Sequence, residues 1–353
     1  MFNTLLKFIG LSGLWILVIS CTDEPTNPQI DYSEILKTET NEVIILTYND
    51  LNEKASLLSS RINEFSANKT QAHLDLIRQL WRDARKPWEQ AEGFLFGPVD
   101  LQGIDPSIDS WPVNVIDLDA VLASNDPLTK DYLDGLEGTL KGFHTLEYLL
   151  FGINGNKTIQ EFTDRQIEYL TACAHSLQGE TNKLFTSWIN GPYPYGEILK
   201  TAGDSSNQVY LSQKSALQEL LDGIITIADE VGNGKINDPF VRNNLTLEES
   251  RFSANSKQDF ADNIRSIQNI YFGSLNTSFN EQSLAGIVKI KDAALHLKTS
   301  DQIQLAITSI LSIPGTFTEA ISANRAAIQN AQDQVRQLQF ILESEIKPLF
   351  DKL

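Results

Sequence analysis

The spacing of apolar residues along the chain predicts that it is almost entirely helical. Between Asp31 and Ala67, apolar side chains recur every three or four residues, with a break expected near Tyr48. Similar spacing predicts helices at 70–96, 129–151 and 163–188, and then at 208–231, 257–272, 281–295, 300–312 and 317–349. No segment of useful length alternates apolar and polar residues as a strand does. The pattern therefore predicts an all-α fold of two packed helical bundles, each resembling a four-helix bundle.

Two stretches of different composition divide this pattern. Residues 100–125 are rich in proline, aspartate and glycine, which predicts an irregular excursion with short helices inside the first half. Residues 191–207 contain the loop Gly-Pro-Tyr-Pro-Tyr-Gly, which is a natural connection between bundles. We therefore expect a first bundle at 31–200 and a second bundle at 201–353.

The first thirty residues do not follow the helical pattern of the rest. Residues 1–20 have one charge, Lys7, followed by an apolar run that is typical of a signal peptide. The run ends in Val-Ile-Ser-Cys, which resembles a lipobox and predicts lipid attachment at Cys21; an ordinary signal peptide with an unrelated cysteine is the alternative. Residues 21–30 are polar and contain two prolines, as expected of a tether. These features predict a cell-envelope lipoprotein of the outer membrane, facing the periplasm or the exterior.

The charge balance narrows the classes of partner. The sequence has 28 basic and 46 acidic residues, and loss of residues 1–20 removes only Lys7, leaving 27 − 46 = −19. Such an acidic protein is a poor match for nucleic acid, whose phosphates require basic contacts. It is compatible with a protein that handles cations, although solubility alone also explains it. After lipidation of Cys21 only Cys173 remains, so no intrachain disulfide is expected.

Candidate chemistry begins in the stretch KGFHTLEYLLFG, where His144 and Glu147 are three residues apart in a helical run. Side chains with this spacing lie on one helix face and can reach a single ion. The same spacing also occurs in a buried polar pair that binds no metal. Gly142 lies beside them and permits close approach of another backbone.

A second group of polar residues lies in WRDARKPWEQAEGFLFGP, where Arg85, Trp88, Glu89 and Glu92 share one helix face. Arg85 and Glu89 are most simply an intrahelical ion pair. Glu92 has no basic partner on its own helix toward the C-terminus, so a bound cation would explain a carboxylate in this aromatic setting.

Four stretches together carry a resemblance to a known family. They are WRDARKPWEQAEGFLFGPV, DPSIDSWP, GFHTLEYLLFG and ESRFSANSKQDFADNIRSIQNIYFG, in this order. The third contains the Gly-x-His-x-x-Glu signature of the imelysin-like family, which is also catalogued as a peptidase family. The resemblance implies an exported, often lipid-anchored protein of two helical bundles, associated with bacterial iron acquisition, with the signature in a pocket between the bundles. It implies His144, Glu147 and Glu92 as metal ligands, and a surrounding pocket of Gly142, Arg85, Trp88, Glu89, Asp109, Trp111, Arg251 and Ser253.

The residues argue for a binding protein more strongly than for a peptidase. A zinc peptidase typically needs three protein ligands and a nearby base, yet the sequence has no His-Glu-x-x-His, and position 148 is tyrosine. One imidazole with carboxylates suits a hard or borderline cation such as iron or manganese, and ligand type alone does not choose between them. Together with the resemblance, which implies iron uptake and an envelope transporter as partner, this favours a protein that binds a metal ion or an iron-containing ligand and has no nucleic-acid partner. Iron is the expected metal, and another divalent metal is the alternative. Two alternatives remain open: a metallopeptidase with Glu147 or Glu92 as base, and a binder of haem, a siderophore or a peptide without direct metal ligation.

Overall fold

The computed structural model describes residues 31–353. The predicted signal peptide, the lipidation site Cys21 and the tether lie outside the described residues. Residues Tyr32–Leu353 form a single unit built from helices, and no strand occurs among them. None of the helices in this part of the chain is long and apolar enough to cross a membrane.

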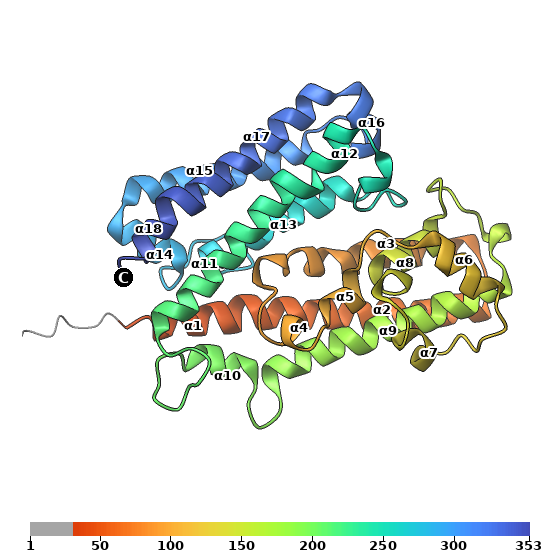
Figure 1. The fold of residues 1–353 in the computed structure, drawn as a ribbon, viewed down its shortest axis with the longest axis horizontal. Coiled ribbons are helices and arrows are strands. Elements are labelled where there is room, and N and C mark those ends of the chain that lie inside the picture. Colours follow the sequence, from red (N-terminus) through yellow and green to blue (C-terminus); the bar gives the residue numbers. More distant parts are fainter. Residues whose placement is uncertain (1–30) are drawn as a thin grey trace, which may run out of the picture. The chain divides into compact units, whose positions relative to one another are not determined.

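The first half of the described chain forms a helical bundle built mainly from α2, α3, α8 and α9 (Figure 1). In it, α2 packs against α3 and α9, and α8 packs against the same two helices. Apolar residues at helical spacing form the buried face of α3, including Leu74, Ile77 and Trp81. The helices of this bundle are α1 (Ser33–Thr38), a π-helical segment η1 (Glu39–Ile44), α2 (Ile45–Ala67), α3 (Gln71–Glu89), α8 (Gly142–Phe151), α9 (Asp164–Ile189) and α10 (Tyr195–Lys200).

An irregular excursion separates α3 from α8. Its α5 segment packs against both α8 and the short helix η3. This contact matters for the site because α5 ends at Asp109 and α8 carries His144. The excursion contains η2 (Glu92–Phe94), α4 (Pro98–Leu101), α5 (Asp105–Asp109), α6 (Val115–Ala123), α7 (Lys130–Asp134) and η3 (Gly138–Leu140), and η4 (Ile159–Glu161) follows α8.

The second half forms another bundle, coloured green to blue in Figure 1. Its principal contacts are α11 with α13 and α17, and α15 with α13 and α17. The helices of this bundle are α11 (Gln213–Asp229), η5 (Glu230–Lys235), α12 (Asn237–Arg242), η6 (Leu245–Leu247), α13 (Ser256–Phe272), α14 (Leu284–Lys291), α15 (Ala293–Leu311), α16 (Phe317–Ala323), α17 (Arg325–Ile341), η7 (Leu342–Ile346) and α18 (Lys347–Phe350).

The two bundles meet through α13, which packs against α3, and through α11, which packs against η2. Glycine permits the closest approach: a Cβ on Gly223 would lie 2.3 Å from the carbonyl oxygen of Gly93. The backbone N–H of Gly93 also donates a 2.7 Å hydrogen bond to Ser266 Oγ of α13. Residue 92 is therefore held against the second bundle by its own neighbour in the chain.

The predicted fold class is confirmed, whereas several predicted helix boundaries are wrong. The expected single helix at 129–151 is three pieces, because Gly142 has a φ of +76° and the chain turns there before α8 begins. The helix expected to reach residue 96 ends at Glu89, so Glu92 lies in a separate 3₁₀ turn. No break occurs near Tyr48; the irregular segment is the π-helical one at Glu39–Ile44. The domain limits at 31–200 and 201–353 stay a prediction.

Candidate metal centre

Arg85, in the last turns of α3, is the centre of a buried charged cluster. Its side chain is 0% exposed, and it pairs with Glu89 Oε1 at 2.5 Å and Glu249 Oε1 at 2.9 Å. It also forms a short ion pair with Asp109, and its Nε lies 3.8 Å from Asp259 Oδ1. The four carboxylates come from α3, from α5, from the loop before α13 and from α13 itself. One guanidinium thus holds together segments of both bundles, and the expected Arg85–Glu89 pair is one of its contacts.

His144 lies beside this guanidinium at the start of α8. Its Nε2 is 3.2 Å from Asp109 Oδ1 and 3.6 Å from Glu249 Oε1, and its Nδ1 is 3.4 Å from Glu147 Oε2. Burial and Arg85 disfavour its charged form, but Asp109 and Glu147 outweigh them and raise the pKa of His144 well above its usual value. The imidazole is therefore oriented by Glu147 on one side and directed toward Asp109 and Glu249 on the other.

Glu147 is itself fixed by the loop before α13. Its Oε1 accepts hydrogen bonds from the backbone N–H of Ser253 at 2.8 Å and from Ser253 Oγ at 2.7 Å. The next residue, Ala254, has a φ of +56°, an unfavourable conformation for a residue with a side chain. Both oxygens of Glu147 are thus engaged, one by Ser253 and one by His144, so Glu147 positions His144.

Lys235, the last residue of the π-helical segment η5, brings a second cation to the cluster. Its Nζ lies 2.9 Å from Glu92 Oε2, 3.4 Å from Glu249 Oε1 and 3.8 Å from Glu89 Oε2. Asn263 of α13 donates to Glu92 Oε2 at 3.0 Å and to Glu89 Oε2 at 2.6 Å. Glu92, which has no basic partner on its own helix, therefore pairs with Lys235 of the second bundle.

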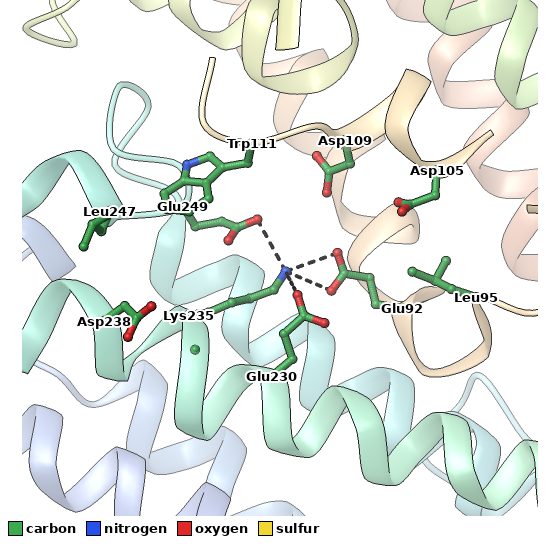
Figure 2. A pocket seen from close by; sticks show the side chains of 11 residues that line it. Glu92, Leu95, Asp105, Asp109, Trp111, Glu230, Lys235, Asp238, Leu247 and Glu249 are labelled. Atoms are coloured by element: carbon green, nitrogen blue, oxygen red, sulfur yellow. Dashed lines mark hydrogen bonds and ion pairs between the residues drawn. The ribbon is translucent and has the colours of Figure 1, made fainter. Parts of the chain in front are cut away.

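A cavity of about 340 Å³ opens on this side of the cluster. Figure 2 shows Lys235 reaching across it toward Glu92 and Glu249. Residues of both halves line the cavity: Glu92, Leu95, Asp105, Asp109, Trp111, Glu230, Gly234, Lys235, Asp238, Leu247 and Glu249. Its wall is therefore dominated by carboxylates.

The buried carboxyl groups divide into two electrostatic classes. Burial would raise the pKa of Asp109 and Glu249, but Arg85, Lys235 and His144 outweigh it; they hold the pKa of Asp109 below its usual value and lower that of Glu249 to about 2. Burial instead dominates at Glu92, whose pKa is raised to about 8 despite Lys235, and at Asp259, whose pKa is raised to about 7 despite Arg85. The cluster thus contains more carboxyl groups than its basic residues can keep ionised.

The structure brings most of the predicted site residues together. Trp88 Nε1 donates to Asp109 Oδ2 at 2.6 Å, Trp111 lines the cavity, and Gly142 packs against the backbone at Ile108. Arg251 is different, because its guanidinium stacks 4.4 Å from the ring centre of Phe252. Among the described residues, it has no hydrogen bond or ion pair with the cluster.

The predicted ligands His144, Glu147 and Glu92 do not share one ligand group. Within residues 31–353 there are instead two groups of three whose ligand atoms lie within 4.8 Å of one another, Asp109–His144–Glu249 and Glu89–Glu92–Asp109. Asp109 belongs to both. Sequence reasoning missed Lys235 and did not single out Glu249, although Glu249 is the first residue of the ESRFSANSKQDFADNIRSIQNIYFG stretch and directly follows Glu248.

The donor set fits a hard or borderline cation. It supplies several carboxylates and one imidazole, which suits iron or manganese and offers no thiolate for a soft metal. Two members of each group line the cavity, namely Asp109 with Glu249 and Asp109 with Glu92. The third members, His144 and Glu89, contact the fully buried Arg85 instead. An ion entering from the cavity therefore meets Glu92, Asp109 and Glu249 first.

These features define a helical protein with a carboxylate-lined cavity between its two bundles and one buried histidine next to the cavity wall. The family model for imelysin, Peptidase_M75, matches residues 44–342, and the chain belongs to this family. The resemblance seen in the sequence is thus confirmed.

Similar proteins agree with this assignment. Iron-regulated protein A of Synechococcus elongatus is 26% identical over 345 residues, which are 97% of this chain and 92% of that protein. A crystal structure of a candidate iron-regulated protein A precursor from Parabacteroides distasonis is 28% identical with a TM-score of 0.84, covering 92% of this chain and 97% of that one. An imelysin-like protein of Psychrobacter arcticus, at 14% identity and a TM-score of 0.74 over 92% of this chain and 97% of that one, has the same fold.

Proposed function

We propose that this protein binds iron as its cargo in the carboxylate-lined cavity and acts in iron uptake at the cell envelope. The observation that carries the proposal is the surplus of buried acid. Six carboxyl groups surround three basic groups in the cluster; the acids are Glu89, Glu92, Asp109, Glu147, Glu249 and Asp259, and the bases are Arg85, His144 and Lys235. Buried acids in excess of their partners are costly, and a multivalent cation offsets that cost.

Glu92, Asp109 and Glu249 would hold the ion, because all three line the cavity. His144 would approach from behind Asp109, in the orientation that Glu147 imposes. Another divalent metal with the same ligand preference, such as manganese, is the alternative cargo. The names of the two iron-regulated relatives support iron.

The competing functions have less support in the geometry. A metallopeptidase needs a general base that is free while the metal is bound, whereas both oxygens of Glu147 are hydrogen-bonded and Glu92 is itself a proposed ligand of the ion. Haem and most siderophores carry carboxylates or other anionic groups, which an acidic cavity wall would repel. We therefore favour a free metal ion as the cargo.

Replacing Glu92 by glutamine is expected to weaken iron binding by about 100-fold or more, because changes merely beside metal ligands already cost about 10–100-fold. Glutamine keeps the length and shape of the Glu92 side chain and removes its charge, so the loss reports on the carboxylate. Metal analysis of the purified protein, made without a histidine tag, and anaerobic titration with Fe(II) measure the effect.

Asp238→Asn is the matched control for this variant. Asp238 lines the same cavity but belongs to neither ligand group, and its side chain is 44% exposed. We expect it to bind iron as the wild type does. If the wild type takes up no Fe(II) or Mn²⁺, or if Glu92→Gln binds as tightly as Asp238→Asn, the proposed site is wrong.

The envelope location is proposed from Cys21, and Cys21→Ser tests it. In bacterial cells the wild type is expected in the membrane fraction, whereas the serine variant, which cannot be lipidated, is expected in the soluble fraction. Cys173→Ser is the control, since Cys173 is the other cysteine of the sequence and is buried in α9. Membrane association that persists in Cys21→Ser would argue against lipid anchoring at this residue.

A further inference from the structure

The ammonium group of Lys235 occupies the place in the cavity where a bound cation is expected. Its Nζ lies 2.9 and 3.2 Å from the two oxygens of Glu92, and 3.4 Å from Glu249 Oε1. Glu89 and Glu230 each place an oxygen 3.8 Å away. Oxygens of four acidic residues therefore surround one primary ammonium, as they would surround a metal ion. Figure 2 shows three of them, Glu92, Glu230 and Glu249.

A metal ion and this ammonium cannot use the same oxygens together. Metal–oxygen bonds are about 2.0–2.6 Å long, so an ion held by Glu92 and Glu249 would lie in the space that separates them from Nζ. Two positive charges at such a distance repel strongly where little water screens them, and the Lys235 side chain is only 8% exposed. Binding at Glu92 and Glu249 therefore requires Lys235 to move.

Lys235 has space to move, whereas Arg85 does not. Lysine has a flexible four-carbon stem, and Lys235 ends a π-helical segment beside an open cavity. The preceding Gly234 has no atom within 4 Å of where a Cβ would lie, so the backbone here is not closely packed. Arg85 is 0% exposed and pairs with four carboxylates. One cation of the cluster is thus fixed and the other is displaceable.

We propose that Lys235 is a built-in competitor for the cation site, and that an incoming metal ion expels its ammonium from between Glu92 and Glu249. This inference rests on the proposed function, because it concerns the same carboxylates. The exchange makes the site selective by charge: a divalent or trivalent ion brings more charge than the ammonium it replaces. A sodium or potassium ion has the same charge as the ammonium, and its binding would leave the displaced ammonium without its carboxylate partners. Lys235 therefore excludes monovalent cations and keeps the carboxylates paired until the cargo arrives.

Lys235→Met tests the inference, because it removes the charge and keeps an unbranched side chain. We expect Mn²⁺ and Fe(II) to bind about tenfold more tightly than to the wild type, since the ion no longer displaces an ammonium. We also expect metal binding to the variant to weaken when choline chloride is replaced by sodium chloride, because sodium ions can then compete for the carboxylates, whereas binding to the wild type should not change. Lys157→Met is the control: Lys157 is buried against Leu149 and Gln166, outside the cavity.

Amine labelling of the wild type gives a readout that does not depend on the variant's folding. Without metal, Lys235 should react slowly with an amine-specific reagent because its ammonium is paired. Saturating Mn²⁺ should increase the labelling of Lys235 severalfold and leave the labelling of Lys157 unchanged. Mass spectrometry measures the labelling of both residues. If the wild type binds metal, but Lys235→Met binds no more tightly and labelling of Lys235 stays low, the inference is wrong and the proposed function stands. If neither protein binds metal, both are wrong.

Discussion

Replacing Arg85 by methionine is expected to lower the free energy of unfolding by about 3–5 kcal/mol, the usual cost of removing one partner from a buried ion pair. The guanidinium is 0% exposed and contacts Glu89, Asp109 and Glu249 within 3 Å. Methionine preserves much of the side-chain volume, so the loss reports on charge more than on packing. The carboxylates left behind must either stay unpaired or take up protons, and both cost free energy at neutral pH.

Urea unfolding followed by circular dichroism measures this effect, with a chelator present so that bound metal does not contribute. Arg61→Met is the control, because Arg61 pairs with Glu64 at 2.7 Å in α2 and the two side chains are 42% and 51% exposed. Such an exposed pair contributes about 0–1 kcal/mol. A loss for Arg85→Met as small as that for Arg61→Met would mean that water reaches the cluster and that its charges are not buried as described.

The fold was predictable from the sequence because its main signal is local. Apolar side chains three and four residues apart, such as Leu74, Ile77 and Trp81, indicate a helix and its buried face without any knowledge of the neighbours. The predictions failed where one residue changes the backbone direction, as at Gly142. The close approach there is to Ile108, which lies 34 positions earlier, so nothing in the local sequence interrupts the helical pattern at Gly142.

The candidate site was predictable only in part, because its essential contacts join distant segments. Arg85, Glu89 and Glu92 are linked by helical spacing, and His144 and Glu147 likewise. Lys235 and Glu92 are 143 positions apart, and nothing near either residue indicates that they pair. The unpaired carboxylate at Glu92 therefore suggested a bound metal, whereas the structure places a lysine there. That lysine changes the expected behaviour of the site from simple binding to exchange of one cation for another.

Replacing Gly142 by alanine is expected to lower the free energy of unfolding by about 2–5 kcal/mol, from backbone strain and overpacking together. Gly142 has a φ of +76°, and a Cβ there would lie 2.2 Å from the carbonyl oxygen of Ile108. Backbone atoms cannot rotate away as a side chain can, so α5 and α8 must separate. Ile108 precedes Asp109, and Gly142 begins the helix that carries His144. The same change should therefore disturb the Asp109–His144 contact of 3.2 Å and weaken iron binding.

Gly103→Ala separates the two causes of this loss. Gly103 also has a positive φ, +59°, but no atom lies within 4 Å of where its Cβ would be. Its substitution should cost only the backbone term of about 1–2 kcal/mol and leave iron binding unchanged. The difference between the two variants in urea unfolding then measures the free-energy cost of the steric contact at Ile108. Their difference in Fe(II) titration measures how much that contact contributes to the placement of the ligands. Equal losses of unfolding free energy and of Fe(II) affinity in both variants would show that α5 can shift without a free-energy cost. They would also show that the close approach at Gly142 does not set the distance between Asp109 and His144.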